Sequence, residues 1–227
     1  MRDLPAGKQK ATQVRSMFDL IAPRYDLLNR VLTFGMDVGW RRRTVASLGL
    51  ERGALVLDVA CGTGDLCREL AGAGYRPVGF DFSAGMLAAA SVAAPLVQAD
   101  GLALPVRTGS ARGLVCGFAL RNVSDIGALF DEFARALGPS GRLAILEVAE
   151  PHSPVLRAGH HVYFHHVVPV VGGLLSDGKA YRWLPESTAY LPAQGELQAM
   201  LGRRGFDGVG VQLFGLGAAQ LITGTRS

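Results

Sequence analysis

Cysteine is scarce in this chain, and its three cysteines have neither the spacing of a zinc ribbon nor that of a redox pair. Cys61 and Cys116 stand at the ends of apolar runs, which predicts small buried thiols and a reducing, cytoplasmic compartment. An excess of one charge is also lacking, because 23 basic and 19 acidic residues leave a net charge of +4. That balance is too weak to indicate a nucleic-acid partner.

Long hydrophobic runs are missing as well. The most apolar stretch, residues 162–175, is too short to cross a bilayer and is interrupted by histidines and by Pro169. Residues 1–10 carry mixed charge and no apolar centre, so no signal peptide is expected. Without internal repeats or low-complexity linkers, residues 1–227 are predicted to form a single domain.

What the chain does have is an alternation of strand and helix patterns. Short apolar runs predict strands, and helical spacing predicts the helices between them. The expected strands are 54–60, 77–81, 95–99, 113–119 and 142–148, and the expected helices are 64–73, one opened by Ser83 as N-cap, and 124–137. This rhythm is typical of an α/β fold, here a Rossmann-like doubly wound sheet that is mostly parallel.

Four segments complete the expected fold. Residues 12–48 show helical spacing, and residues 138–141 predict a helix stop and a turn. Residues 150–190 are rich in histidine, aromatic residues and proline, which predicts an insertion that covers the substrate at the carboxyl edge of the sheet. The tail predicts a helix over 196–204 and two strands that return to the sheet as a C-terminal antiparallel hairpin.

A buried apolar strand leads into a glycine turn and a helix start in the most informative part of the chain. Gly62 and Gly64 permit a sharp turn and a close approach of backbone to ligand, as at the cofactor sites of open α/β folds. A dinucleotide fingerprint needs a third glycine where this chain has Cys67, and Asp65 in the first helical turn would repel a pyrophosphate. Asp58 and Asp65 are compatible with a cationic ligand, so S-adenosylmethionine is favoured over a dinucleotide.

Two further carboxylates fit an adenosine group. Asp81 ends the second strand, where it can accept hydrogen bonds from both ribose hydroxyls. Asp100 ends the third strand, where it can accept from the adenine amino group. Each alone could be a helix cap or a surface acid, but acids at three successive strand ends favour a cofactor site.

Three longer motifs resemble the signatures of the quinone-biosynthesis C-methyltransferases, a family of class I S-adenosylmethionine-dependent enzymes. The motifs are residues 18–29 with 32–35 and 40–41, residues 118–123, and residues 181–187 with Pro192 and Gln194. The resemblance implies that residues 12–48 form an N-terminal helical lid. It also implies methyl transfer to a ring carbon of a prenylated hydroquinone, from demethylmenaquinol to menaquinol, without a metal.

The candidate site residues follow from the glycine turn, the strand ends and this resemblance. The cofactor-binding candidates are Asp58, Gly62, Thr63, Gly64, Asp81, Phe82, Asp100, Gly101 and Gly117. The catalytic candidates are Tyr25, Arg121, Asn122 and His161. The chain departs from the family pattern at Asp100-Gly101, at Ala119 and at His160-His161, where the family has Asn-Ala, Gly and Tyr-Asp.

A ring carbon becomes a nucleophile when an adjacent phenol loses its proton. Arg121 could stabilise the developing phenolate, and Asn122 could orient a hydroxyl or a water. Tyr25, on the helix that resembles a lid, could complete the site. The alternative for Arg121 is a salt bridge to Asp125 or Asp131.

All five histidines lie between residues 152 and 166. His161 and His165 share a face if the segment is helical, but no cysteine or carboxylate completes a metal set, so no metal is expected. The segment is either a half-buried helix or the source of a general base, for which His161 is the first candidate. Residues 162–175 either line a channel for a prenyl tail or belong to the ordinary core.

Several alternatives stay open at this point. They are a methyltransferase for another small phenolic or lipid acceptor, a cofactor-binding protein without catalysis and, least favoured, a nicotinamide oxidoreductase. The basic run at residues 41–43 is either a solvated helix face or a contact for anionic lipid headgroups. Peripheral contact with the inner face of a membrane and a homodimer are therefore both open.

Overall fold

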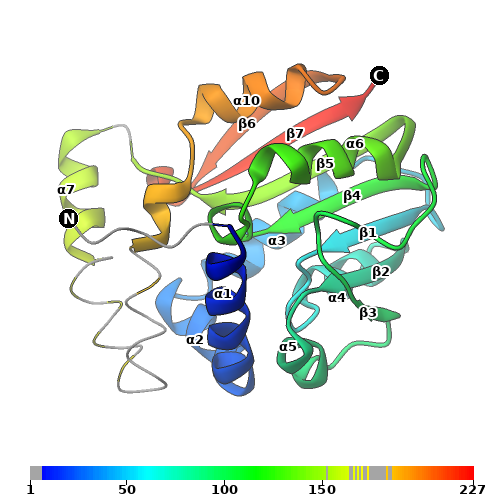
Figure 1. The fold of residues 1–227 in the computed structure, drawn as a ribbon. Coiled ribbons are helices and arrows are strands. Elements are labelled where there is room, and N and C mark those ends of the chain that lie inside the picture. The colour runs from blue at the N-terminus through cyan, green and yellow to red at the C-terminus, as the bar shows by residue number, and fades with distance from the viewer. Residues whose placement is uncertain are drawn as a thin grey trace.

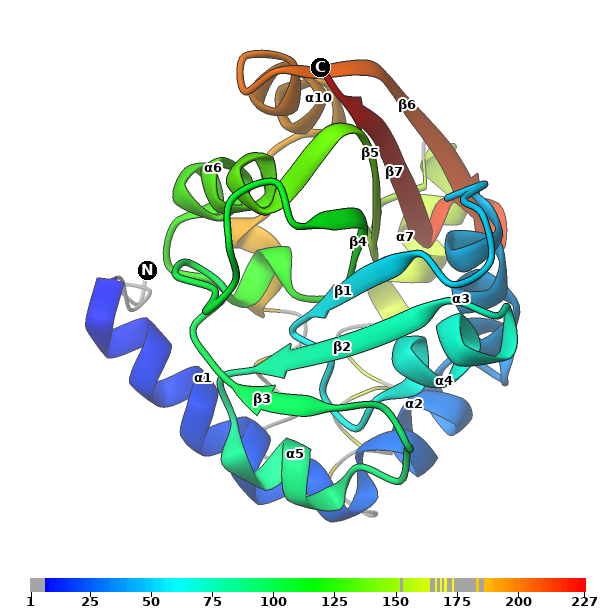
Figure 2. The same ribbon diagram turned by 90° about the vertical axis from the view of Figure 1, so that its right-hand side faces the viewer.

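The computed structural model describes residues 7–151, 153–163 and 186–227, together with His166, Val168, Val170, Gly173 and Trp183. A seven-stranded sheet in the order β3-β2-β1-β4-β5-β7-β6 forms its centre (Figures 1 and 2). The strands are β1 (Leu55–Val59), β2 (Arg76–Asp81), β3 (Leu96–Gln98), β4 (Ala111–Gly117), β5 (Leu137–Val148), β6 (Phe206–Phe214) and β7 (Ala219–Arg226).

Strands β1 to β5 pair in parallel, whereas β7 runs antiparallel to both β5 and β6. The predicted Rossmann-like sheet with a C-terminal antiparallel hairpin is thereby confirmed. Chain order reverses between β1 and β4, which are neighbours in the sheet. In open α/β sheets the carboxyl ends of the strands at such a reversal form the usual ligand crevice.

Helices cover both faces of the sheet because successive side chains of a strand point to opposite faces. On one face α6 (Ile126–Ala136) and α10 (Gln194–Gly202) share an apolar core with β1 and β4, with α6 over β5 and α10 over β6. On the other face lie α3 (Met36–Ala46) and α4 (Asp65–Gly72). In β1, Leu57 and Val59 belong to the first core and Val56 to the second.

The segment predicted as a lid is helical, and it begins at Gly7 and therefore earlier than the helical spacing indicated, while its role as a lid stays a prediction. Its parts are α1 (Gly7–Ile21), the short 3-10 helix η1 (Ala22–Arg24), α2 (Tyr25–Leu32) and α3. Ile21 and Leu28 are buried against Met86 of α5 (Ala84–Ala89), the helix that Ser83 caps as predicted by accepting from Met86 N. Figure 1 shows α1 and α2 on the side of the sheet toward which β1 and β4 point.

The sequence prediction was wrong at the start of β5. Residues 138–141, predicted as a turn after the helix stop, lie inside β5, which begins at Leu137 directly after α6. Ser140 has φ +59°, and the pairing with β4 shifts between Ala111 and Gly113. A local irregularity in the strand therefore replaces the predicted turn.

The segment 150–190 is described only in part. It includes α7 (Pro154–Val162) and the 3-10 helix η4 (Thr188–Tyr190). His152, His165 and most of the apolar stretch 162–175 lie outside the described residues, so the predicted covering insertion and prenyl channel stay predictions. Among the described helices, none is both long and apolar enough to cross a membrane.

Candidate functional site

A cleft open to solvent lies at the carboxyl ends of β1, β2 and β4. Helix α1 contributes Ala11, Val14, Arg15 and Phe18 to its wall. Eight of the candidate residues also line it: Tyr25, Gly62, Asp81, Phe82, Asp100, Gly101, Gly117 and Asn122. The fold therefore brings together residues that lie almost 100 positions apart in the chain.

The loop after β1 makes the tight turn that the glycines predicted. Gly62 and Gly64 both have positive φ, and a Cβ on Gly64 would lie 2.7 Å from Val92 Cγ1. Ala60, just before this turn, also has positive φ, at +58°. A non-glycine residue in that conformation is strained by about 1–2 kcal/mol, and such strain is characteristic of functional sites.

Asp81 is the best-defined cofactor candidate. Its two carboxylate oxygens accept from the backbone N–H groups of Gly62 (2.7 Å) and Ser83 (2.8 Å). These bonds fix the carboxylate at the cleft wall, and each oxygen keeps a lone pair for a ligand hydroxyl. Burial raises the pKa of Asp81 above its usual value, although the two N–H groups oppose that shift.

Phe82 and Asp100 lie beside this carboxylate. The Phe82 ring is partly exposed, with the Arg15 guanidinium of α1 5.1 Å from its centre. Asp100 Oδ1 accepts from Leu102 N at 2.9 Å, and within the described part of the chain the carboxylate makes no other hydrogen bond. Because Oδ2 is unused in these contacts, Asp100 can receive the amino group of an adenine.

Gly101 and Gly117 are needed for space. A Cβ on Gly101 would lie 3.2 Å from both Leu129 Cδ1 and Val59 Cγ1, and one on Gly117 would lie 2.9 Å from Leu66 Cδ1. Both glycines thus allow the cleft floor to approach the two cores closely.

Three cofactor candidates are not among the residues that line the cleft. Asp58 is fully buried, and burial raises its pKa to about 7 although the thiol and backbone N–H of Cys67 oppose the shift. The Thr63 hydroxyl donates to Asp26 of α2, and Gly64 forms the cap of α4. These residues hold the loop after β1 in place without lining the cleft.

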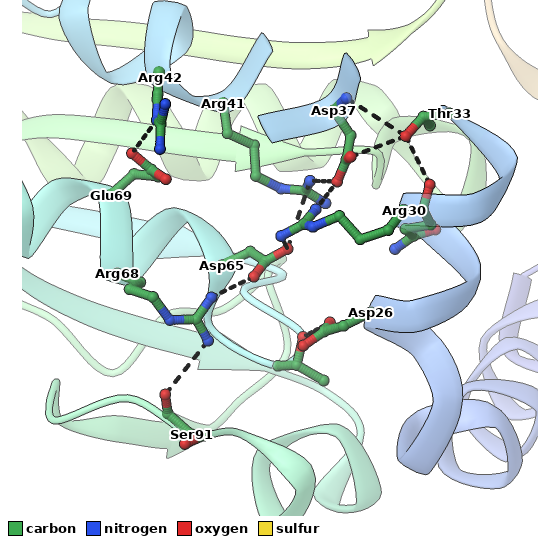
Figure 3. A network of polar contacts seen from close by, with 12 residues as sticks. Asp26, Arg30, Thr33, Asp37, Arg41, Arg42, Asp65, Arg68, Glu69 and Ser91 are labelled. Atoms are coloured by element: carbon green, nitrogen blue, oxygen red, sulfur yellow. Dashed lines mark hydrogen bonds and ion pairs between the residues drawn. The ribbon is translucent and has the colours of Figure 1, made fainter. Parts of the chain in front are cut away.

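Asp65 takes part in a network of ion pairs (Figure 3). It contacts Arg68 at 2.6 Å, Arg30 of α2 at 3.1 Å and Arg41 of α3 at 3.5 Å. The buried Asp37 pairs with the same Arg30 and Arg41. These arginines therefore compensate the Asp65 charge. The expectation that Asp65 would repel a pyrophosphate is weakened accordingly.

Neither acid expected as a partner of Arg121 occupies that role. Arg121 pairs with Glu147 of β5, which is fully buried and also accepts from Val148 N. Asp125 instead caps α6 by accepting from Ala128 N, and Asp131 pairs with Arg204 at 2.8 Å. The Arg121–Glu147 pair was missed because Arg121 lies in a 3-10 helix after β4 (Leu120–Asn122) and Glu147 lies on β5, 26 residues further along the chain.

Tyr25 and Asn122 line the cleft, whereas Arg121 does not. Burial raises the pKa of the Tyr25 hydroxyl, while a hydrogen bond with Asn29 and the charges of Arg41 and Arg121 oppose that shift. Tyr25 therefore stays protonated at neutral pH and can donate to an anionic oxygen. Arg121 is close enough to affect that hydroxyl but is not among the residues lining the cleft.

His161 is the candidate that the structure does not bring to the others. It lies on α7, is exposed and is not among the residues that line the cleft. Its assignment as general base thus has no support from the position of its helix.

Sequence reasoning also missed Phe118, which directly follows β4 at the cleft and has φ +56°. The Phe118 ring lies about 6 Å from the guanidinium carbons of Arg41 (5.8 Å) and Arg121 (6.0 Å). An aromatic residue directly after a strand end was a usable signal, but its backbone conformation could not be read from the sequence.

Comparisons with known proteins show similarity to one family over nearly the whole chain. A family model described as the ubiE/COQ5 methyltransferase family matches residues 6–226. The chain is 41% identical over 222 residues to the ubiquinone/menaquinone biosynthesis C-methyltransferase UbiE of Syntrophotalea carbinolica, with 94% of each chain covered. It is 42% identical over 221 residues to the demethylmenaquinone methyltransferase of Thermus thermophilus, covering 92% of this chain and 100% of that protein.

Solved structures support the fold. Magnesium protoporphyrin IX methyltransferase from Synechocystis PCC 6803 with bound S-adenosylmethionine aligns with a TM-score of 0.65 at 19% identity, covering 99% of this chain and 100% of that one. The S-adenosylmethionine complex of Haemonchus contortus phosphoethanolamine N-methyltransferase 2 aligns with a TM-score of 0.62 at 15% identity. The alignment covers 83% of this chain and 52% of that one, so it spans about half of the nematode enzyme.

Proposed function

Because the chain belongs to the ubiE/COQ5 methyltransferase family, we propose that it transfers a methyl group from S-adenosylmethionine to a ring carbon of a prenylated hydroquinone, converting demethylmenaquinol to menaquinol. The observation that carries the proposal is the cleft itself. It joins carboxylates suited to adenosine, at Asp81 and Asp100, to the phenol and amide of Tyr25 and Asn122.

The cofactor half of the cleft fits S-adenosylmethionine. Asp81 is held by two backbone N–H groups with lone pairs to spare, and Asp100 lies on the next loop. Phe82 offers an aromatic ring, and Gly62, Gly101 and Gly117 line the same wall without side chains. When bound there, S-adenosylmethionine supplies an electrophilic methyl group on a sulfonium.

The acceptor half of the cleft favours a phenolate. Tyr25 remains protonated and can donate its hydroxyl hydrogen to a phenolate oxygen, whereas the Arg121 charge is paired with the buried Glu147. Asn122 can orient the acceptor with its amide. Phe18, Met86 and Leu129 give the cleft apolar walls that exclude water from the anionic oxygen.

The assay is methylation of demethylmenaquinol by the purified protein with labelled S-adenosylmethionine. We expect a methylated ring, and we expect cells lacking the protein to accumulate the demethylated quinone. An Asp81→Asn variant should weaken cofactor binding about tenfold or more in calorimetry, since a charge-assisted hydrogen bond contributes roughly 1.5–3 kcal/mol. Cofactor binding with methylation of a different phenol would support the alternative acceptor class and refute menaquinol formation.

We further propose that the lid and α7 contact an anionic membrane surface. Residues 7–46 contain eight basic and three acidic side chains, and without the buried Lys10, Arg41 and Asp37 they still carry +4, as much as the whole chain. Leu27, Phe34 and Val162 are exposed, and the Phe34 ring lies 6.0 Å from that of Tyr163 at the end of α7. We expect the protein to sediment with anionic vesicles but not with zwitterionic vesicles, and we expect Phe34→Ser to lose that binding. Equal binding to both kinds of vesicle would refute the role of charge.

The homodimer stays a prediction, which light scattering can test.

A further inference from the structure

The side-chain amide of Asn122 is held at both of its ends. Its Nδ2 donates to the carbonyl oxygen of Phe118 at 3.2 Å, and its Oδ1 accepts from the indole Nε1 of Trp183 at 3.0 Å. Asn122 is 9% exposed and lines the cleft, whereas Trp183 is 6% exposed. The bond between them is therefore shielded from water, where a lost partner costs the most.

The indole fixes which way the amide points. A tryptophan N–H is a donor and cannot accept, so Oδ1 of Asn122 must face it and Nδ2 must face Phe118. Only one of the two Nδ2 hydrogens is used in the contacts among the described residues. The second is thereby directed as a donor, the polarity needed to bind an anionic oxygen.

Trp183 is in turn linked to the lid. Its ring lies 5.8 Å from that of Tyr190 in η4, and the Lys10 ammonium of α1 lies 3.6 Å above the Tyr190 ring. Lys10 also donates to the carbonyl oxygen of Val123 at 2.6 Å, next to Asn122 in the chain. A cation over an aromatic face contributes about 0.5–2 kcal/mol, more when water is excluded, and Lys10 is 3% exposed.

We propose that Trp183 is a positioning residue that orients the Asn122 amide toward the methyl acceptor, and that Lys10 couples the position of α1 to that orientation through Tyr190. The inference rests on the proposed methyl transfer, in which Asn122 contacts the acceptor. It assigns a role to a side chain that does not line the cleft.

The kinetic test compares Trp183→Phe with Trp40→Phe, the same substitution at the other tryptophan of the chain. Trp183→Phe keeps an aromatic ring but removes the N–H, so kcat should fall about tenfold while the affinity for S-adenosylmethionine is unchanged. Trp40 packs against the second core, so its variant should keep wild-type kcat. If Trp183 acts through Asn122, the Asn122→Leu/Trp183→Phe double variant should be no slower than Asn122→Leu alone. If the kcat losses of the two single variants instead multiply in the double variant, the assignment is refuted.

A second measurement needs no methyl acceptor, so its result does not depend on the proposed function. In the Trp40→Phe background the fluorescence of Trp183 is observed alone, and it should shift when Asn122→Leu removes the acceptor of the indole N–H. Lys10→Met should shift it as well, by releasing Tyr190. An unchanged spectrum in Asn122→Leu would refute the hydrogen bond whichever acceptor the enzyme uses, and an unchanged spectrum in Lys10→Met would refute the coupling to α1.

Discussion

Replacing Asp58 by asparagine should remove a loss of stability that the wild-type protein suffers as the pH rises from 5 to 8. Asp58 is fully buried beside the start of α4, and burial raises its pKa to about 7 from 3.8. The thiol and backbone N–H of Cys67 and the charge of Arg41 oppose that shift, whereas the charge of Asp81 adds to it. Ionising this side chain in the folded protein is therefore unfavourable.

The sign and size of this change in the free energy of unfolding follow from proton linkage. Between the two pKa values the folded chain binds a proton that the unfolded chain has lost, so the free energy of unfolding falls as the pH rises. With pKa values of about 7 folded and 3.8 unfolded, this one group removes roughly 2.5 kcal/mol between pH 5 and pH 8. Asparagine keeps the shape and has no proton to lose, so the variant escapes that loss.

The assay is urea unfolding of wild type and Asp58→Asn, without cofactor, at pH 5, 6, 7 and 8. The difference in unfolding free energy should move in favour of the variant by roughly 2.5 kcal/mol across this range, mostly below pH 7. A difference that stays constant with pH would refute a raised pKa at Asp58. Cys67→Ala serves as a second variant, because it removes a thiol that lowers this pKa and should move the transition to higher pH.

Three further outcomes are expected. In the same denaturation assay, Gly64→Ala should lower the free energy of unfolding by about 2–3 kcal/mol, because the residue has φ +87° and its Cβ would meet Val92. The control is Gly72→Ala at the end of α4, where a Cβ meets nothing within 4 Å, and it should be neutral or slightly stabilising. Asp37→Asn should cost about 3 kcal/mol, since it leaves Arg30 and the buried Arg41 with Asp65 as their shared partner; a loss under 1 kcal/mol would contradict the network in Figure 3. His161→Gln should keep wild-type kcat, because His161 is exposed on α7 and apart from the cleft lining, and a hundredfold loss would restore it as a general base.

The order of strands and helices was predictable because it depends on local patterns. Apolar runs and helical spacing located β1 to β4 and the helices between them, and the N-cap at Ser83 was visible as a single residue. The cofactor side was predictable for a related reason. In a parallel sheet, residues that directly follow strands meet at one edge, so Asp81 and Asp100 had to lie near the glycine turn.

The partners of charged residues were not predictable, because they depend on packing between distant segments. Arg121 pairs across the sheet with Glu147, and Asp65 pairs with arginines from two lid helices. Nothing in the spacing of these residues distinguishes them from solvated charges. The same limit explains His161, since a histidine cluster indicates possible chemistry but not the side of the molecule on which its helix lies.

The contacts of the lid give a physical reason for the N-terminal motif. Asp19 accepts from the Ser83 hydroxyl and from Gly85 N after β2, and Asp26 accepts from Thr63 after β1. Asp37 acts through its two arginines on Asp65 in the first turn of α4. The three acids of the lid thus engage two connections at the carboxyl edge of the sheet, Asp19 the one after β2 and Asp26 and Asp37 the one between β1 and α4. Because the wall of the cleft also takes residues from α1, a change in any of these contacts alters the cofactor loops and the acceptor wall together.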